Sequence, residues 1–196
     1  MNLANKLTIF RIILVPVMVI VSFFETDIAI FNIPITYLIM DFIFIIASIT
    51  DQLDGHIARS RNQITTFGKF LDPLADKILV LTAMILLVEV GKIPAWIPII
   101  VIAREFIVSG YRLVAVEKGG KVIAASIWGK IKTVTQMIAI ILAFVDLNSF
   151  GDCFKGKLTG YELVLNLIVT VMLIIQTIAT VFSGYNYVKD GKEFLK

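Results

Sequence analysis

Long hydrophobic runs, separated by short polar segments, make up most of the chain. An α-helix needs about 20 mainly apolar residues to cross the hydrocarbon core of a bilayer. The pattern therefore predicts an all-α integral membrane protein with six transmembrane helices. The loops are too short to form a soluble domain, so residues 1–196 are predicted to form a single membrane domain. The expected helices are Leu7–Phe24, Ile33–Arg59, Pro73–Val90, Pro94–Val116, Val122–Val145 and Gly160–Ser183.

Composition supports this class. Hydrophobic residues make up 58% of the chain, and the mean hydropathy of +0.92 is too high for a soluble domain. The basic residues flank apolar segments, which argues against nucleic-acid binding. Cys153 is the only cysteine, so no intrachain disulfide can form. The first apolar run lacks a small-residue cleavage site, and we expect no cleavable signal peptide.

The basic residues also predict the orientation. Six helices place both termini on one side of the membrane. Of the 18 lysines and arginines, only Lys92, Lys155 and Lys157 fall on the opposite side. Positive residues are enriched in cytoplasmic segments. We therefore expect a multi-pass protein of the cytoplasmic membrane, with both termini and the polar ends of the second and third helices facing the cytoplasm.

A cluster of acidic residues interrupts the hydrophobic pattern between the second and third helices. Asp51 and Asp54 are three residues apart, and Asp72 and Asp76 are four apart, so each pair shares one helix face. Pro73 disfavours a helical conformation for Asp72 and suits a first helical position. The sequence thus predicts Asp72 as an N-cap and Asp76 at the end of the first turn. Two antiparallel helices with a short connection would bring the four carboxylates together.

Four neighbouring carboxylates repel one another unless cations neutralise them, and two divalent cations would balance their charge. Oxygen ligands favour Mg²⁺, Mn²⁺ or Ca²⁺, and paired metals typically hold a phosphoryl centre. Small residues at Gly55, Ala58 and Gly68 would let a substrate lie against the helix backbone. Arg59 can bind a phosphate through two hydrogen bonds. A solvated loop with two helix caps is the alternative, but it does not explain the repeated spacing.

The motif D-x2-D-G-x2-A-R-x8-G-x3-D-x3-D resembles the signature of the CDP-alcohol phosphatidyltransferase family. It matches at Asp51, Asp54, Gly55, Ala58, Arg59, Gly68, Asp72 and Asp76. The start of the chain, with Asn5 and Thr8, is similar to the P-N-x-L-T-x-x-R opening of that family, with Ala4 in place of proline. A capped helix start with interfacial polar residues is the alternative for this segment. Within the family, the chain resembles the bacterial phosphatidylglycerophosphate synthases.

The resemblance implies transfer of a phosphatidyl group from CDP-diacylglycerol to glycerol 3-phosphate, with release of CMP, by a homodimer embedded in membrane lipid. It implies two divalent cations, Mg²⁺ or Mn²⁺, on the four aspartates, and Asp76 as general base for the acceptor hydroxyl. It also implies that the CDP portion of the donor is bound by Asn5, Thr8, Gly55, Ala58, Arg59 and Gly68.

The fourth predicted helix carries two arginines on one face. Arg104 and Arg112 are eight residues apart with Val108 between them. Arg104 lies ten residues past Pro94, roughly 15 Å into the membrane, where an arginine must face protein or a wet cavity. We predict a pocket for the acceptor phosphate. The alternative is a structural pair between Arg104 and Glu105, with Arg112 extending to the interface.

Other polar residues in the apolar segments give weaker signals. Lys130 and Lys132 do not share a helix face, so only one is expected to point inward; Lys130 is our first choice for the acceptor phosphate. Asp41 lies roughly 15 Å from Asp51 along a helix and receives no role. The last helix offers little chemistry: we expect interhelical hydrogen bonds from Gln176, Thr177 and Thr180, and interfacial anchoring by Tyr185 and Tyr187.

Two other functions fit parts of the pattern. A sister transferase could use an inositol phosphate, serine or a second lipid as acceptor; the arginines argue against serine but not against an inositol phosphate. A divalent-cation transporter would also place carboxylates in the membrane. It predicts acids spread across the membrane depth, whereas four cluster at one end and only Asp41 lies toward the other. A purely structural subunit leaves the motif unexplained.

Overall fold

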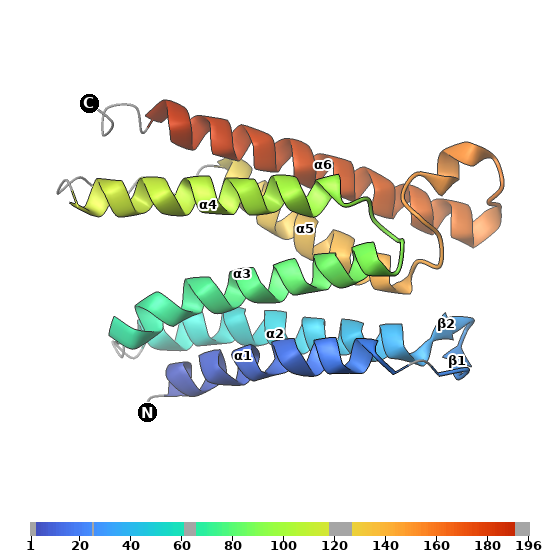
Figure 1. Cartoon of the computed structure of the whole chain (residues 1–196), viewed down its shortest axis with the longest axis horizontal. Helices are drawn as coiled ribbons and strands as arrows, with labels where there is room; N and C mark the ends of the chain where they lie inside the picture. Colours follow the sequence, from blue (N-terminus) through green and yellow to red (C-terminus); the bar gives the residue numbers. More distant parts are fainter. Residues whose placement is uncertain (1–2, 25, 61–65, 118–126, 191–196) are drawn as a thin grey trace. The chain divides into compact units, whose positions relative to one another are not determined.

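The structure, a computed structural model, describes residues 3–24, 26–60, 66–117 and 127–190; at some of these positions, among them 51–60, 66–70, 72 and 112, it describes the helix but not the side chain. The described part of the chain is mostly helical and contains the six expected helices (Figure 1). They are α1 (Leu3–Ser22), α2 (Ile35–Ser60), α3 (Thr66–Glu89), α4 (Trp96–Glu117), α5 (Ile127–Val145) and α6 (Gly160–Asp190). Residues 122–126, predicted to begin the fifth helix, lie outside the described ranges.

The start of α3 corrects one prediction. The helix begins at Thr66, seven residues before Pro73, so Asp72 is not an N-cap and Asp76 is not in the first turn. A proline within a helix leaves one carbonyl without its donor, but its backbone angle φ remains helical. The apolar residues Phe67, Phe70 and Leu71 continue the helical period on the N-terminal side of Pro73. That pattern outweighs the single missing hydrogen bond.

The structure of α6 corrects two further predictions. The helix continues seven residues past Ser183, and Tyr187 is only 2% exposed, so Tyr187 is not an interfacial anchor. The hydroxyls of Thr177 and Thr180 donate to carbonyls four residues earlier in α6. The amide of Gln176 donates to Thr177 in the same helix. These three hydrogen bonds lie within α6 rather than between helices, because a hydroxyl can reach the carbonyl one turn back.

The chain folds as two compact units. Unit 1 comprises Met1–Lys92 and Ala143–Leu147, and unit 2 comprises Ile93–Leu142 and Asn148–Lys196. In unit 1, α1 packs against both α2 and α3, and α2 and α3 run antiparallel (Figure 1). In unit 2, α4 packs against α6, and the 3-10 helix η1 (Asp152–Lys155) also contacts α6. The core of unit 1 includes the fully buried side chains of Met18, Met40, Phe44, Leu79 and Met84.

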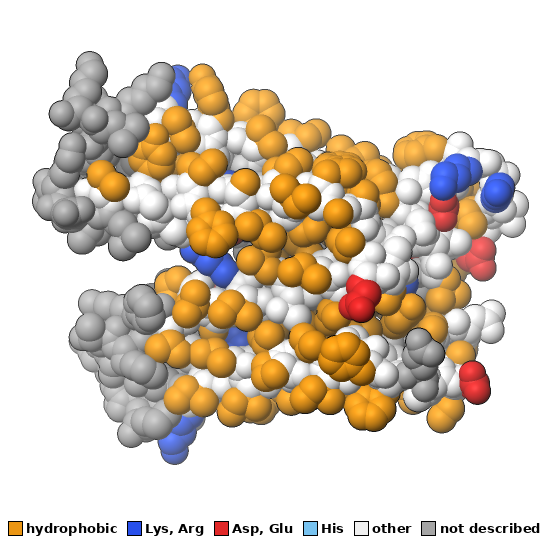
Figure 2. All heavy atoms as spheres, in the orientation of Figure 1, with side chains coloured by type: hydrophobic (Ala, Val, Ile, Leu, Met, Phe, Trp, Pro, Cys, Tyr) orange, Lys and Arg blue, Asp and Glu red, His pale blue; other side chains and the backbone are white. Residues whose placement is uncertain are grey.

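Apolar side chains also cover much of the outer surface. On the face shown in Figure 2, they lie along the helices of each unit. Among the described residues, two helices are long and apolar enough to cross a membrane, Ile127–Val145 and Gly160–Lys189. The apolar part of α2, Ile35–Thr50, is shorter. By length and composition, these two helices fit the expectation of a helical membrane protein.

Asp41 belongs to a group of buried charged residues in unit 1, together with Lys92 and Asp146. The Lys92 ammonium donates to the carbonyls of Ala143 (3.0 Å) and Phe144 (2.8 Å), in the last turn of α5. It also lies 4.2 Å from the centre of the Tyr37 ring. Burial lowers the pKa of Lys92 to about 8, against the opposing effect of the carboxylates of Asp146 and Asp41. Lys92 therefore stays mostly charged at neutral pH and caps α5.

Candidate active site

The four motif aspartates lie at matched depths on two antiparallel helices. Asp54 is six residues before the end of α2, and Asp72 is six residues after the start of α3. Asp51 is nine residues before the end of α2, and Asp76 is ten after the start of α3. At the rise of an α-helix, one pair lies about 9 Å and the other about 14–15 Å from the connection between the helices. Figure 1 shows α2 and α3 alongside each other here.

Four aspartates at these positions would offer carboxylates, which are hard oxygen ligands for divalent cations. Their two levels along the helices would be compatible with two ions. Asp76, whose side chain is described, is half-buried on α3. Among the other described side chains, no group of three or more His, Cys, Asp or Glu residues could hold a metal. The aspartate motif therefore remains the candidate metal site.

The predicted donor-binding residues all belong to unit 1. Gly55, Ala58 and Arg59 lie on α2, one to two turns past Asp51, and Gly68 lies in the first turn of α3. Their side chains lie outside the described set. Asn5 and Thr8 lie in the first two turns of α1, which packs against both motif helices. The Thr8 side chain is buried, with 1% exposed.

Arg11 is a residue whose burial the sequence did not reveal. It lies on α1 one turn after Thr8 and is fully buried in unit 1, with 0% exposed. A charged side chain inside a protein requires polar or charged partners. From its place at the start of the first apolar run, Arg11 would be expected at the membrane interface. The packing of α1 against α2 and α3 buries it instead.

A second polar cluster, in unit 2, surrounds Arg104. One carboxylate oxygen of Glu105 accepts from both Arg104 and Lys132, at 2.8 Å each. The other terminal nitrogen of Arg104 donates to the Ser183 hydroxyl at 2.6 Å. The side chains of Arg104, Glu105 and Lys132 are only 10–13% exposed. Two cations and one carboxylate leave a formal charge of +1 in a largely enclosed site.

Residues of α6 also lie against the Arg104 side chain. The methylene Cγ of Arg104 is 3.4 Å from where a side chain on Gly184 would begin. The Tyr187 ring lies 5.8 Å from the guanidinium carbon. With Ser183, these residues form the arginine-binding face of α6. This face was not predicted from the sequence. The signal that could have indicated it is a serine, a glycine and a tyrosine at helical spacing beside otherwise apolar residues.

The two lysines of α5 point in different directions, as predicted. Lys130 is exposed, whereas Lys132 is buried and shares Glu105 with Arg104. The structure thus brings together Arg104 and the less favoured of the two lysines. The ion pair between Arg104 and Glu105, our alternative interpretation, is also present. Arg112 lies two turns after Arg104 on α4, and its side chain lies outside the described set.

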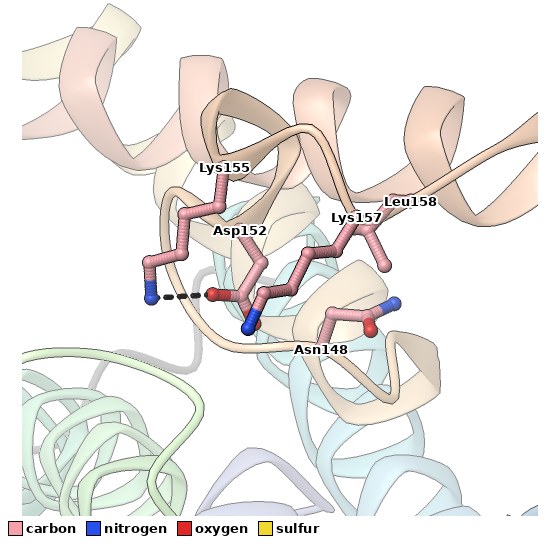
Figure 3. A pocket seen from close by; sticks show the side chains of 5 residues that line it. All are labelled: Asn148, Asp152, Lys155, Lys157 and Leu158. Atoms are coloured by element: carbon pink, nitrogen blue, oxygen red, sulfur yellow. Dashed lines mark ion pairs between the residues drawn. The ribbon is translucent and has the colours of Figure 1, made fainter.

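A shallow pocket of about 220 Å³ lies beside η1 in unit 2. Figure 3 shows its lining residues, with the Lys155 ammonium 2.7 Å from Asp152. The hydrogen bond from Lys155, with one from the Ser149 backbone, lowers the pKa of Asp152. The side chain of Lys155 is 63% exposed. An exposed lysine that is already paired does not form a binding site for a ligand. We interpret the ion pair between Lys155 and Asp152 as stabilising the loop before α6.

Comparison with known proteins gives the family. The sequence model described as CDP-alcohol phosphatidyltransferase matches residues 1–183. A Bacillus subtilis protein named CDP-diacylglycerol--glycerol-3-phosphate 3-phosphatidyltransferase is 41% identical over 100% of this chain and 97% of its own length. A Haemophilus influenzae protein of the same name is 37% identical over 97% of this chain and 94% of its own. A Mycobacterium tuberculosis protein named probable phosphatidylglycerophosphate synthase is 38% identical over 75% and 68%. The chain belongs to the CDP-alcohol phosphatidyltransferase family.

Proposed function

We propose that the protein transfers the phosphatidyl group of CDP-diacylglycerol to glycerol 3-phosphate, producing phosphatidylglycerophosphate and CMP. The observation that carries this proposal is the complete aspartate motif, placed at two matched depths on α2 and α3. The names of relatives that align over nearly the whole chain support the choice of donor and acceptor. They favour this reaction over an inositol phosphate acceptor and over cation transport.

The four aspartates are assigned to two divalent cations. Asp51, Asp54, Asp72 and Asp76 supply enough carboxylate oxygens to hold two ions and balance their charge. When bound, Mg²⁺ or Mn²⁺ would polarise the diphosphate of the donor and offset the charge on departing CMP. Asp76 would also accept the proton of the attacking hydroxyl. The CDP portion would be bound by Asn5, Thr8, Gly55, Ala58, Arg59 and Gly68.

The acceptor phosphate is assigned to the cluster in unit 2. Arg104 and Lys132 supply two largely enclosed cations, and Arg112 follows Arg104 two turns later on α4. Lys132 replaces Lys130 in this assignment because Lys130 is exposed. Guanidinium groups bind phosphate oxygens through paired hydrogen bonds, which gives geometric selectivity for a phosphate over a hydroxyl.

We further propose that all six helices cross the cytoplasmic membrane, with both termini and the aspartate motif on the cytoplasmic side. The distribution of lysine and arginine supports this orientation. The single-domain interpretation is supported by a family match that runs through both units. The resemblance to the family also supports a homodimer.

Release of CMP from CDP-diacylglycerol by the purified protein tests the reaction. We expect release only when Mg²⁺ or Mn²⁺ and glycerol 3-phosphate are both present. Metal-dependent release with an inositol phosphate instead of glycerol 3-phosphate would overturn the acceptor. Absence of release by folded protein under every condition, together with Mn²⁺ flux into proteoliposomes, would support the transporter instead.

Ser183→Ala tests the arginine-binding face of α6. A hydrogen bond to a charged group contributes about 1.5–3 kcal/mol, and its loss should let Arg104 leave its position. We therefore expect the KM for glycerol 3-phosphate to rise about tenfold while kcat changes little. Steady-state kinetics at saturating donor would measure both quantities.

The control is Thr180→Val, since Thr180 is equally buried one turn earlier and its hydroxyl donates to the carbonyl of Gln176 in the same helix. It should leave the KM unchanged. In an Arg104→Ala background, Ser183→Ala should add no further effect. A full additional effect there would show that Ser183 acts independently of Arg104. An unchanged KM in Arg104→Ala alone would remove the acceptor assignment itself.

A further inference from the structure

The connection between α1 and α2 contains a short β-hairpin with a strained two-residue loop. Strands β1 (Ala29–Ile30) and β2 (Ile33–Pro34) pair antiparallel, with Ile30 opposite Ile33. The two turn residues both have positive φ, 53° at Phe31 and 65° at Asn32. This conformation is typical of a type I′ turn, which favours Asn and Gly. Asn32 fits that preference, but a bulky aromatic residue at positive φ is an outlier.

The strained residue presents its ring to the surroundings. Phe31 is 93% exposed; Ile30 in β1 is 46% exposed, and Ile28, which directly precedes β1, is 61% exposed. At the end of α1, Phe23 and Phe24 are 73% and 63% exposed. Residues 23–34 contain no lysine or arginine. Phe31 thus has an unfavourable backbone conformation that no packing contact compensates. Such residues are often functional.

This apolar surface continues an exposed stripe on α1. Phe10, Ile13, Val17 and Ile20 are spaced by three or four residues, and each is at least 38% exposed. Phe24 follows four residues after Ile20. The spacing places the four side chains on α1 along one side of the helix, and Phe24 lies just beyond the end of that helix. An exposed apolar stripe on a membrane helix is its lipid-facing side, and the stripe leads directly to the hairpin.

The backbone limits how deep the hairpin can lie. Its two short strands pair only with each other, so the outer edge of each leaves polar backbone groups that require water. Such groups are not tolerated in the hydrocarbon core. The hairpin is held at its base by bonds from Ile35 N to Ile28 O (3.0 Å) and from the Thr36 hydroxyl to Phe24 O (2.9 Å). It is therefore fixed beside the ends of α1 and α2.

We propose that the hairpin anchor, residues 28–34, inserts Phe31, Ile28 and Ile30 into the boundary between headgroups and acyl chains, where the lipid-facing stripe of α1 ends. Aromatic and aliphatic side chains are favoured at this depth. The occupant is the lipid bilayer rather than a second copy of the chain, because the exposed apolar surface of the hairpin continues the exposed apolar stripe of α1, which faces lipid in the proposed membrane location. The proposal rests on the proposed membrane location.

Site-specific fluorescence in vesicles tests the anchor. In a Cys153→Ala background, single cysteines replacing Phe31, Ile20 or Lys155 would carry an environment-sensitive nitrobenzoxadiazole label. The full chain would be reconstituted in phosphatidylcholine–phosphatidylglycerol vesicles with lipids brominated at defined acyl positions. We expect the label at position 31 to emit at shorter wavelength than at position 155. Bromine near the headgroup should quench it most strongly, whereas Ile20 should be quenched by deeper bromines.

Labelling position 31 removes the Phe31 ring itself. A label at position 28 therefore reports on the hairpin with Phe31 intact. Phe31→Asn, which suits the turn, should shift this label toward water without unfolding the protein. Water-like emission and no quenching at positions 31 and 28, with position 20 quenched, would overturn the anchor alone. Water-like emission at all three sites would overturn the membrane proposal as well. Self-quenching at position 31 that depends on protein density would instead indicate contact between copies.

Discussion

Asp76→Asn is expected to reduce CMP release about 1,000-fold, the range lost when a general base is removed. Asparagine keeps the size of the side chain, so α3 and its packing should be retained. The substitution removes the proton acceptor and one charge from the proposed metal site. The rate should therefore fall at every metal concentration, which separates loss of the base from weakened metal binding. Initial rates of CMP release across a Mn²⁺ titration would measure this.

Glu89→Gln is the matched control, because Glu89 is an exposed acid at the other end of the same helix. We expect it to retain the wild-type rate. If Asp76→Asn recovered full activity at high Mn²⁺, Asp76 would be a metal ligand only. Another group would then have to accept the proton. Wild-type activity at all concentrations would remove Asp76 from the site.

Lys92→Met is expected to produce the largest loss of stability. The substitution removes a buried cation that interacts electrostatically with Asp146 and Asp41, and it leaves the carbonyls of Ala143 and Phe144 without the lysine donor. Breaking a buried ion pair by removing one partner costs about 3–5 kcal/mol. For a chain of this size, the midpoint of thermal unfolding in detergent should fall by about 10 °C.

Two further variants test the cause. Lys155→Met removes a lysine that is 63% exposed, and it should leave the midpoint unchanged. Asp41→Asn in the Lys92→Met background should recover part of the loss, because it removes one uncompensated charge. If the double variant were less stable than Lys92→Met by the full effect of Asp41→Asn alone, the two residues would not be coupled.

The fold was predictable to the extent that it depends on hydrophobic periodicity. Each of the six helices corresponds to an apolar run, and the predicted and observed ranges overlap in every case. The boundaries failed where a local signal opposed packing. Pro73 is a strong helix-start signal, yet α3 begins seven residues earlier. Polar and aromatic residues after Ser183 indicated an interfacial end, yet they continue α6 and bury Tyr187.

The candidate site divides in the same way. The aspartate motif is local, with fixed spacing within 26 residues, so its placement on two consecutive helices could be inferred from the sequence. The positions of Asp72 and Asp76 relative to the start of α3 could not, because Pro73 gave a false start signal. The environment of Arg104 depends on contacts between distant segments: Ser183 is 79 residues away and Lys132 is 27 residues from Glu105. No periodicity links such positions. Only the packing of α4 against its neighbours selects Lys132 over Lys130.

The carboxylate of Glu105 has a consequence for selectivity among anions. A membrane enzyme of this kind works beside a large excess of phospholipids whose phosphodiester groups carry a single negative charge. Because one oxygen of Glu105 already engages Arg104 and Lys132, an incoming anion must compete with an internal carboxylate. A phosphomonoester carries nearly two negative charges at neutral pH, and it competes better than a phosphodiester. If this cluster binds the acceptor phosphate, as proposed, Glu105 would favour phosphomonoesters over the phosphodiesters of the surrounding lipid.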